Sequence, residues 1–247
     1  MPQSISGMRV LVFGATGGIG AQLTRELTQA GAHVFGVARR QDELEALSNE
    51  TGMVAHVGDV LDADQVKEAF SAATSSLGGI DSVVLAVGSI LLRPVHLVKD
   101  ADFDQTIAIN LGAAFRVVRT ACKLMMRADG GSIILFSTAA AQIGLPNHEV
   151  IAAAKAGIEG LVRSAAATYA GRGVRVNCVA PGLVRTPLAE PITRNPSSLE
   201  ASRGMHALGR IGEPDDVTHA VRFLLESTWT TGQTLVVDGG LSGIKSA

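Results

Sequence analysis

The chain has 247 residues, of which 47% are apolar and only 4% aromatic. This length suits one α/β domain with a large core of aliphatic side chains better than two domains. The formal net charge is −2 and both signs are mixed along the chain, which argues against nucleic acid or an anionic membrane surface as a partner.

Short apolar runs of the buried-strand type alternate with helical patterns along the whole chain. The predicted strands are 8–13, 33–38, 53–57, 82–87, 132–136, 175–179 and 234–237. The predicted helices are one that ends at residue 30, then 42–50, 62–77, 100–127 in one or two pieces, 149–170, and one that begins at Pro214. This alternation predicts an α/β fold: a doubly wound, mostly parallel seven-stranded sheet of the Rossmann type, in a single domain spanning residues 1–247.

Segment 183–212 breaks this rhythm. It is rich in Pro, Ser, Arg and Asn and has weak periodicity. A long irregular segment inside a compact domain is usually a lid or a binding loop. We therefore expect 183–212 to cover a substrate.

The cysteines and the amino-terminal residues bear on the compartment. Cys122 and Cys178 lie in apolar stretches without ligand-like spacing, so we expect buried free thiols in a reducing compartment, with no disulfide and no bound metal. Residues 1–7 lack a basic region followed by an apolar run, and no apolar run is long enough to span a bilayer. A soluble cytoplasmic protein is the resulting expectation.

A glycine-rich turn, 14–20, directly follows the first strand and begins the first helix. Glycines there permit a tight turn and let the backbone approach a pyrophosphate, while the free N–H groups of the helix start face the phosphates. A glycine cluster can also be a plain tight turn. Because it has the required strand–turn–helix context, we predict a dinucleotide-binding site.

The glycine spacing, G-x-x-x-G-x-G, resembles that of the short-chain dehydrogenase/reductase family, in particular its single-domain branch of 3-oxoacyl-thioester reductases. Further similarities follow in chain order: Asp59-Val60, Gly88, Asn110, the strand that ends at Thr138, the helix with Lys155, the loop 177–182 with Thr186, then 209–214 and 231–240. The chain departs from the family pattern at Phe13, where Thr is usual, and at Ala86, where Asn is usual.

The resemblance implies a bound nicotinamide nucleotide. The implied contacts are Gly14, Thr16, Gly18, Ile19, Gly20, Asp59, Val60, Gly88, Lys155, Pro181, Gly182, Val184 and Thr186. At the end of the second strand, Ala38 replaces the acidic residue that would bind a ribose 2′-hydroxyl, and Arg39 and Arg40 follow. Arginine there accommodates a 2′-phosphate, so we expect NADP(H) rather than NAD(H). Two solvated loop arginines are the alternative.

The catalytic set implied by the resemblance is incomplete. Lys155 and Asn110 are present, and Thr138 supplies a hydroxyl at the serine position. Ser137, one residue earlier, would point to the other face of an extended strand. The tyrosine that gives or takes the proton should precede Lys155 by one helical turn, but that residue is Ile151. The chain's one tyrosine, Tyr169, lies about 20 Å beyond Lys155 along the helix and cannot replace it.

Three routes remain open without that tyrosine. Another acid could serve, with His148, Glu149 and His96 as candidates by position. Water or the substrate could supply the proton, or the protein could bind nucleotide without turnover. The structural alternatives are a helix-start role for His148 and lining or surface positions for His96 and His206.

Asn110 and Lys155 also have structural alternatives. Asn110 could be a mid-helix residue bonded to backbone, and Lys155 a solvated helix lysine.

Together, the motifs favour an NADP(H)-dependent oxidoreductase of the short-chain dehydrogenase/reductase type. Its expected substrate is a small ketone, a 3-oxoacyl thioester or the matching alcohol. The alternative is an inactive NADP(H)-binding sensor or partner subunit. The small apolar residues of helices 110–127 and 149–170, together with the resemblance, imply a homodimer or homotetramer.

Overall fold

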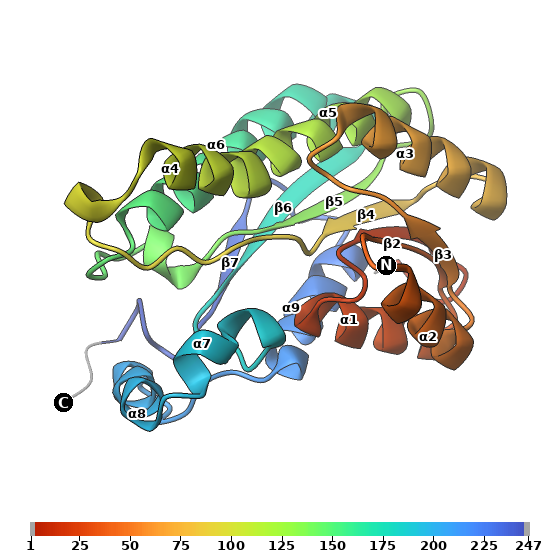
Figure 1. The fold of residues 1–247 in the computed structure, drawn as a ribbon. Coiled ribbons are helices and arrows are strands. Elements are labelled where there is room, and N and C mark those ends of the chain that lie inside the picture. Colours follow the sequence, from red (N-terminus) through yellow and green to blue (C-terminus); the bar gives the residue numbers. More distant parts are fainter. Residues whose placement is uncertain (1–2, 245–247) are drawn as a thin grey trace.

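The structure, a computed structural model, describes residues 3–244 and consists of one parallel sheet between two layers of helices (Figure 1). The strand order is β3-β2-β1-β4-β5-β6-β7, and neighbouring strands pair in parallel. The strands are β1 Arg9–Phe13, β2 His33–Ala38, β3 Val54–Val57, β4 Ser82–Leu85, β5 Gly131–Phe136, β6 Val174–Pro181 and β7 Thr234–Val237. The predicted fold class, a seven-stranded Rossmann-type sheet, is confirmed.

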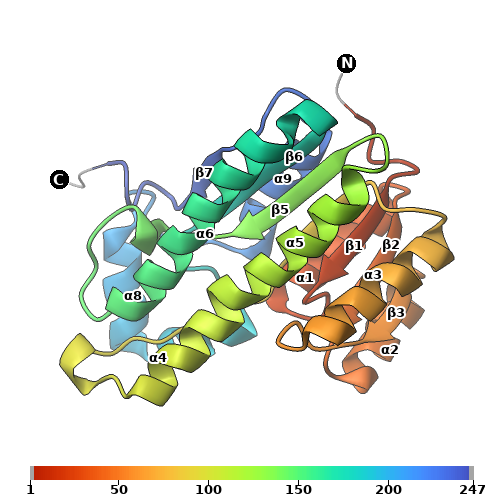
Figure 2. The same cartoon turned by 90° about the horizontal axis from the view of Figure 1, so that it is seen from above.

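The helices divide between the two faces of the sheet (Figure 2). They are α1 Gly18–Gln29, α2 Gln41–Thr51, α3 Ala63–Leu77, α4 Asp100–Ile107, α5 Ala113–Met125, α6 Glu149–Tyr169, α7 Glu190–Thr193, α8 Pro196–Met205 and α9 Pro214–Glu226. Helices α3, α5 and α6 bury one core against the sheet, and α1, α2 and α9 bury the other. Among the residues described, no helix is long and apolar enough to cross a membrane.

Side chains along the central strands point alternately into the two cores. In β1, Leu11 and Phe13 belong to the core under α3, α5 and α6, whereas Val10 and Val12 belong to the core under α1, α2 and α9. Successive strand residues point to opposite faces, and a parallel sheet covered on both sides needs apolar residues on each. The strands therefore appear in the sequence as continuous apolar runs, because both of their faces are buried.

The strand order reverses between β1 and β4. From β1 the chain winds to β2 and β3 on one side, then crosses to β4 on the other. Such a switch point leaves a crevice at the carboxyl ends of the two central strands. The glycine-rich turn follows β1, and Ala86 follows β4 and donates its N–H to Phe13 O at 2.8 Å. The turn therefore lies at the switch point.

The helix predicted over 100–127 in one or two pieces is divided into α4 and α5 by a π-turn, Ala108–Gly112, and ends at Met125 rather than at residue 127. The prediction of an irregular 183–212 is wrong for Pro196–Met205, which is helical: Asn195 caps α8 by accepting the N–H of Ser198 at 3.0 Å. A ten-residue helix with few apolar side chains leaves little periodicity in the sequence.

Candidate nucleotide and substrate site

The glycine-rich turn is shaped by close backbone contacts. Gly14 has φ of +78°, and a Cβ there would lie 2.6 Å from the carbonyl oxygen of Ala86, so only glycine fits. Gly17 precedes α1 and has no side chain to cap the first amides of the helix. These amides and the positive end of the helix dipole are therefore available to an anion.

The start of α1 faces the loop after β6. A Cβ on Gly18 would lie 2.7 Å from Cγ2 of Thr186, a residue that begins the short turn Pro187–Ala189 and accepts the N–H of Ala189 at 3.4 Å. The backbone at Gly18 therefore packs against Thr186 so closely that no side chain fits between the two segments. The structure thus brings together two segments of the candidate site that lie far apart in the sequence.

The ends of β2 and β3 form the opposite side of the crevice. Gly58 donates its N–H to Ala38 O at 3.0 Å, which holds the segment before Asp59 beside the end of β2. Arg40 forms an ion pair with Glu43 at 2.6 Å. Arg39 is exposed and has no ion pair within residues 3–244. Of the two arginines, Arg39 is thus the one available to a phosphate.

Asp59 and Val60 are ordered by local contacts. Asp59 donates its N–H to the side chain of Gln65 at 2.9 Å and accepts the N–H of Leu61 through its carboxylate at 2.9 Å. Val60 is buried in the core beneath α3. This loop is therefore held in place before any ligand arrives.

Lys155, Asn110 and Gly88 converge at the centre of the site. A Cβ on Gly88 would lie 3.1 Å from Oδ1 of Asn110 and 3.2 Å from Nζ of Lys155. Lys155 is buried on α6 and donates from Nζ to the carbonyl oxygen of Phe136 at 3.0 Å. Burial lowers the pKa of Lys155 to about 8, because an ammonium group loses solvation there.

Asn110 lies in the π-turn between α4 and α5. Its amide nitrogen donates to Ser89 Oγ and to Thr106 O, both at 2.9 Å, and its Oδ1 accepts the N–H of Ser89 at 3.3 Å. Asn110 is thus bonded to backbone, as the structural alternative expected, and through Ser89 it also holds the segment after β4 in place. A π-turn inside a helix is frequent at functional sites.

The two hydroxyls at the end of β5 have different surroundings. Thr138 is half-buried and begins a short turn, Ala139–Ala141, where its Oγ1 accepts the N–H of Ala140 at 3.3 Å. Ser137 is buried, and its Oγ donates to Oε1 of Glu159 on α6 at 2.6 Å. This agrees with the alternation expected for neighbouring residues of an extended segment.

The sequence reasoning missed Glu159 and Gln142. Glu159 is buried, and both of its carboxylate oxygens accept hydrogen bonds from Nε2 of Gln142, each at 2.7 Å. With Ser137, these side chains tie the loop of Thr138 to the helix of Lys155. The available signal was a single glutamate four residues after Lys155, on the apolar face of an alanine-rich helix.

The remaining candidates lie around the start of α6. Ile151, at the position of the missing tyrosine, is buried with 5% of its surface exposed. His148 is half-buried at the helix start, with Nδ1 2.7 Å from the carbonyl oxygen of Pro146. Glu149 and His96 are exposed. His148 therefore precedes the first residue of α6 without a side-chain capping bond, and its Nε2 has no hydrogen-bond partner among the described residues.

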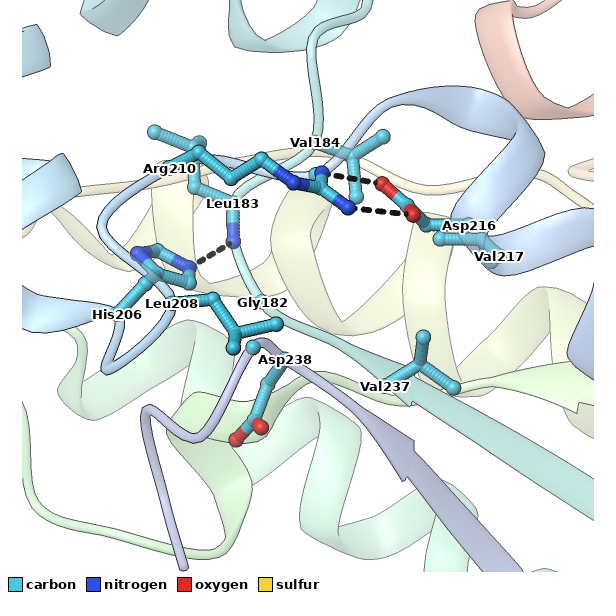
Figure 3. A pocket seen from close by; sticks show the side chains of 12 residues that line it. Gly182, Leu183, Val184, His206, Leu208, Arg210, Asp216, Val217, Val237 and Asp238 are labelled. Atoms are coloured by element: carbon cyan, nitrogen blue, oxygen red, sulfur yellow. Dashed lines mark hydrogen bonds and ion pairs between the residues drawn. The ribbon is translucent and has the colours of Figure 1, made fainter. Parts of the chain in front are cut away.

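A cavity of about 140 Å³ lies beside the loop after β6 (Figure 3). Gly182 and Val184 line it from that loop, Asp238 from the loop after β7, and His206 from the end of α8. His206 is buried, so the expectation of a lining residue holds and that of a surface residue is wrong. No group of three or more metal-ligating side chains occurs in the part of the chain that the structure describes.

This sheet, with a glycine turn at its switch point and a buried lysine at the strand ends, defines a Rossmann-type dinucleotide-binding domain. Residues 14–242 match a family model described as enoyl-(acyl carrier protein) reductase. The chain belongs to the short-chain dehydrogenase/reductase family, as its motifs predicted.

Relatives match over nearly the whole chain. The 3-oxoacyl-(acyl-carrier-protein) reductase FabG of Thermotoga maritima is 35% identical over 96% of this chain and 98% of its own length. D-threitol dehydrogenase of Mycolicibacterium smegmatis is 34% identical over 96% and 93%. A short-chain type dehydrogenase/reductase from Mycobacterium ulcerans superimposes with a TM-score of 0.93 at 29% identity, over 97% of this chain and 91% of that one.

Proposed function

We propose that the chain is an NADP(H)-dependent oxidoreductase that interconverts a carbonyl compound and its alcohol, with Ile151 in place of the proton-transferring tyrosine. The observation that carries the proposal is the meeting of Gly88, Asn110 and buried Lys155 Nζ at the carboxyl ends of the strands. Burying the ammonium group of Lys155 costs free energy, which favours a functional role over a purely structural one.

The chain's own geometry fits such a nucleotide. At Gly14 and Gly18 the turn packs so closely against Ala86 and Thr186 that neither position has space for a side chain, and the amides at the start of α1 favour an anion. Arg39 would bind the 2′-phosphate, with Thr16, Ile19 and Gly20 around the pyrophosphate and Asp59 and Val60 at the adenine. Pro181, Gly182, Val184 and Thr186 would hold the nicotinamide side.

When bound, the nicotinamide supplies or takes a hydride. Lys155 would hold the nicotinamide ribose and place positive charge beside the reacting oxygen, while Thr138 would orient that oxygen by a hydrogen bond. Lys155 keeps most of its charge at neutral pH, because its pKa of about 8 lies above 7. Ile151 has no proton to give, so His148 or water would transfer it.

The second candidate is an NADP(H)-binding protein without turnover, which the apolar, buried Ile151 favours. A general acid typically contributes about 10²–10⁴-fold in rate, or roughly 3–5 kcal/mol. Hydride transfer could survive that loss at a low rate. The intact surroundings of Lys155 and Asn110 support the enzyme.

The substrate would lie among Thr138, Ile151, the segment after Gly88 and a lid formed by 183–212, which carries α7 and α8. Small ketones and 3-oxoacyl thioesters, or the corresponding alcohols, are the proposed class, in line with the named activities of the relatives. We further propose a cytoplasmic homodimer or homotetramer assembled through α5 and α6.

The test combines binding with turnover. NADPH and NADH are titrated against the purified protein, followed by assays with small ketones, 3-oxoacyl thioesters and polyols. Ketone reduction with NADPH supports the enzyme. NADPH binding without turnover on the whole panel supports the binding protein, and no binding of either nucleotide contradicts both.

A further inference from the structure

His206 has a defined hydrogen-bonding role at both ring nitrogens. Its Nδ1 lies 2.6 Å from the carbonyl oxygen of Ser202 on α8, and its Nε2 lies 3.2 Å from the backbone nitrogen of Leu183 (Figure 3). A carbonyl oxygen only accepts and a backbone N–H only donates. These partners therefore require the neutral ring, in which Nδ1 carries the proton and the lone pair of Nε2 accepts the N–H of Leu183.

The ring also lies in close contact with two glycine loops. A Cβ on Gly182 would lie 2.6 Å from Nε2 of His206, and a Cβ on Gly239 would lie 3.6 Å from its Cδ2. Gly182 donates its N–H to Val237 O at 3.0 Å, which joins the loop after β6 to β7. His206 thus joins three segments that are distant in sequence: the loop after β6, the loop after β7 and α8.

Three charged groups line the same cavity: Asp238, Arg210 and Asp216. Asp238, in the loop after β7, has partial burial, which would raise its pKa, but hydrogen bonds from Ser242 and Gly240 lower that pKa overall. Arg210 pairs with Asp216 of α9 at 2.6 Å. The N–H of Leu183 is directed instead at Nε2 of His206.

We propose that neutral His206 is a positioning residue: it sets the backbone at Gly182–Leu183 and couples this loop to helix α8 of the lid. The inference rests on the proposed function, which places that loop at the nicotinamide side of the site. The coupling depends on the lone pair of Nε2. Without an acceptor at this position the loop is released, and NADPH binding weakens.

The test uses two amide variants that each keep one of the two contacts. In His206→Gln the side-chain oxygen replaces Nε2 as the acceptor for Leu183. In His206→Asn the shorter amide keeps the contact with Ser202 and cannot reach Leu183. The control is His219→Gln, which changes an exposed histidine of α9.

The first readout, hydrogen-exchange protection of the Leu183 amide, needs neither nucleotide nor turnover. We expect protection in the wild type, in His219→Gln and in His206→Gln, and its loss in His206→Asn. The second readout, NADPH affinity, should fall about fivefold in His206→Asn and change little in His206→Gln, as expected for one hydrogen bond.

The outcomes separate the two proposals. Equal protection of the Leu183 amide in His206→Asn and in the wild type, or NADPH affinity that does not follow protection, overturns the role of His206. Loss of that protection in His206→Gln, which keeps an acceptor, also overturns it, and this outcome decides even where His206→Asn fails to fold. Absence of NADPH binding in every protein, with the expected exchange pattern, leaves His206 as a link between loop and lid and overturns the proposed function instead.

Discussion

Ser137 and Glu159 form a buried 2.6 Å hydrogen bond between the end of β5 and the middle of α6. Thr138 follows Ser137 directly, and Lys155 precedes Glu159 by one helical turn. The hydroxyl and the ammonium group proposed to face the substrate are therefore held in register by a polar contact on the side away from it.

This contact predicts different stabilities for two variants at one position. Glu159→Leu removes the acceptor of the Gln142 amide and leaves the buried hydroxyl of Ser137 with only the carbonyl oxygen of Lys155, at 3.3 Å, which should cost about 1–3 kcal/mol of unfolding free energy. Glu159→Gln keeps an acceptor and should cost less than about 1 kcal/mol. Urea denaturation measures both. Equal losses would show that the acceptor on Glu159 has no role.

The exposed guanidinium of Arg39 predicts nucleotide preference. The wild type should bind NADPH at least about tenfold more tightly than NADH, and Arg39→Ala should shrink that gap, because a charge-assisted contact to the 2′-phosphate is lost. Arg40→Ala is the control, since Arg40 is already paired with Glu43. Titration at fixed salt measures both effects. Equal affinities of the wild type for the two nucleotides would contradict the assignment.

The buried Ile151 predicts a gain of activity. Ile151→Tyr should place a hydroxyl one turn before Lys155 and raise ketone reduction by up to about 10²–10⁴-fold. Ile151→Phe adds the same ring without the hydroxyl and should give no gain. Because the site is 5% exposed, overpacking should cost both variants about 1–3 kcal/mol, which thermal denaturation checks. Equal rates in the two variants would exclude the hydroxyl as a proton donor.

His148 offers the competing route. If it already transfers the proton, Ile151→Tyr should gain little, and His148→Ala should abolish activity.

The burial of Lys155 predicts a pH dependence of stability. Its pKa is lowered to about 8 in the fold, whereas an unfolded lysine titrates near about 10.4, so between these values the unfolded chain binds more protons. Stability should therefore rise with pH from about 8 to about 10.4, by up to roughly 3 kcal/mol relative to Lys155→Met. Denaturant titrations across this range measure the difference. Parallel pH profiles would show that Lys155 is solvated.

The outer surface of α5 and α6 predicts assembly. Phe115 on α5 is 51% exposed, with the guanidinium of Arg119 5.2 Å from its ring centre, and Ala156 is exposed on α6. Ala156→Glu should place a negative charge on the same face of each subunit, so that the charges repel one another across a symmetric interface and a dimer or tetramer dissociates into smaller species. Light scattering measures the mass, with Gln41→Glu on the opposite layer as the control. A wild-type monomer at all concentrations would contradict the proposal.

Much of the fold was predictable because its signals are local. Buried parallel strands need continuous apolar runs, and a phosphate turn at a switch point needs glycines where backbones meet, as at Gly14. The order of the motifs along the chain then indicated the family. The sequence also placed Ile151 one turn before Lys155, because helix periodicity alone sets that relation.

Only the tertiary structure decided the contacts between distant segments. Nothing local to His206 reveals that its ring accepts the N–H of Leu183, and nothing near Glu159 reveals its bond to Ser137. Buried polar groups are satisfied by whichever partners the packed chain brings within about 3 Å, and those partners depend on how layers meet rather than on sequence spacing. The sequence thus determined the sheet, the glycine-rich turn and the candidate catalytic positions, whereas packing decided which side chains hold them in place.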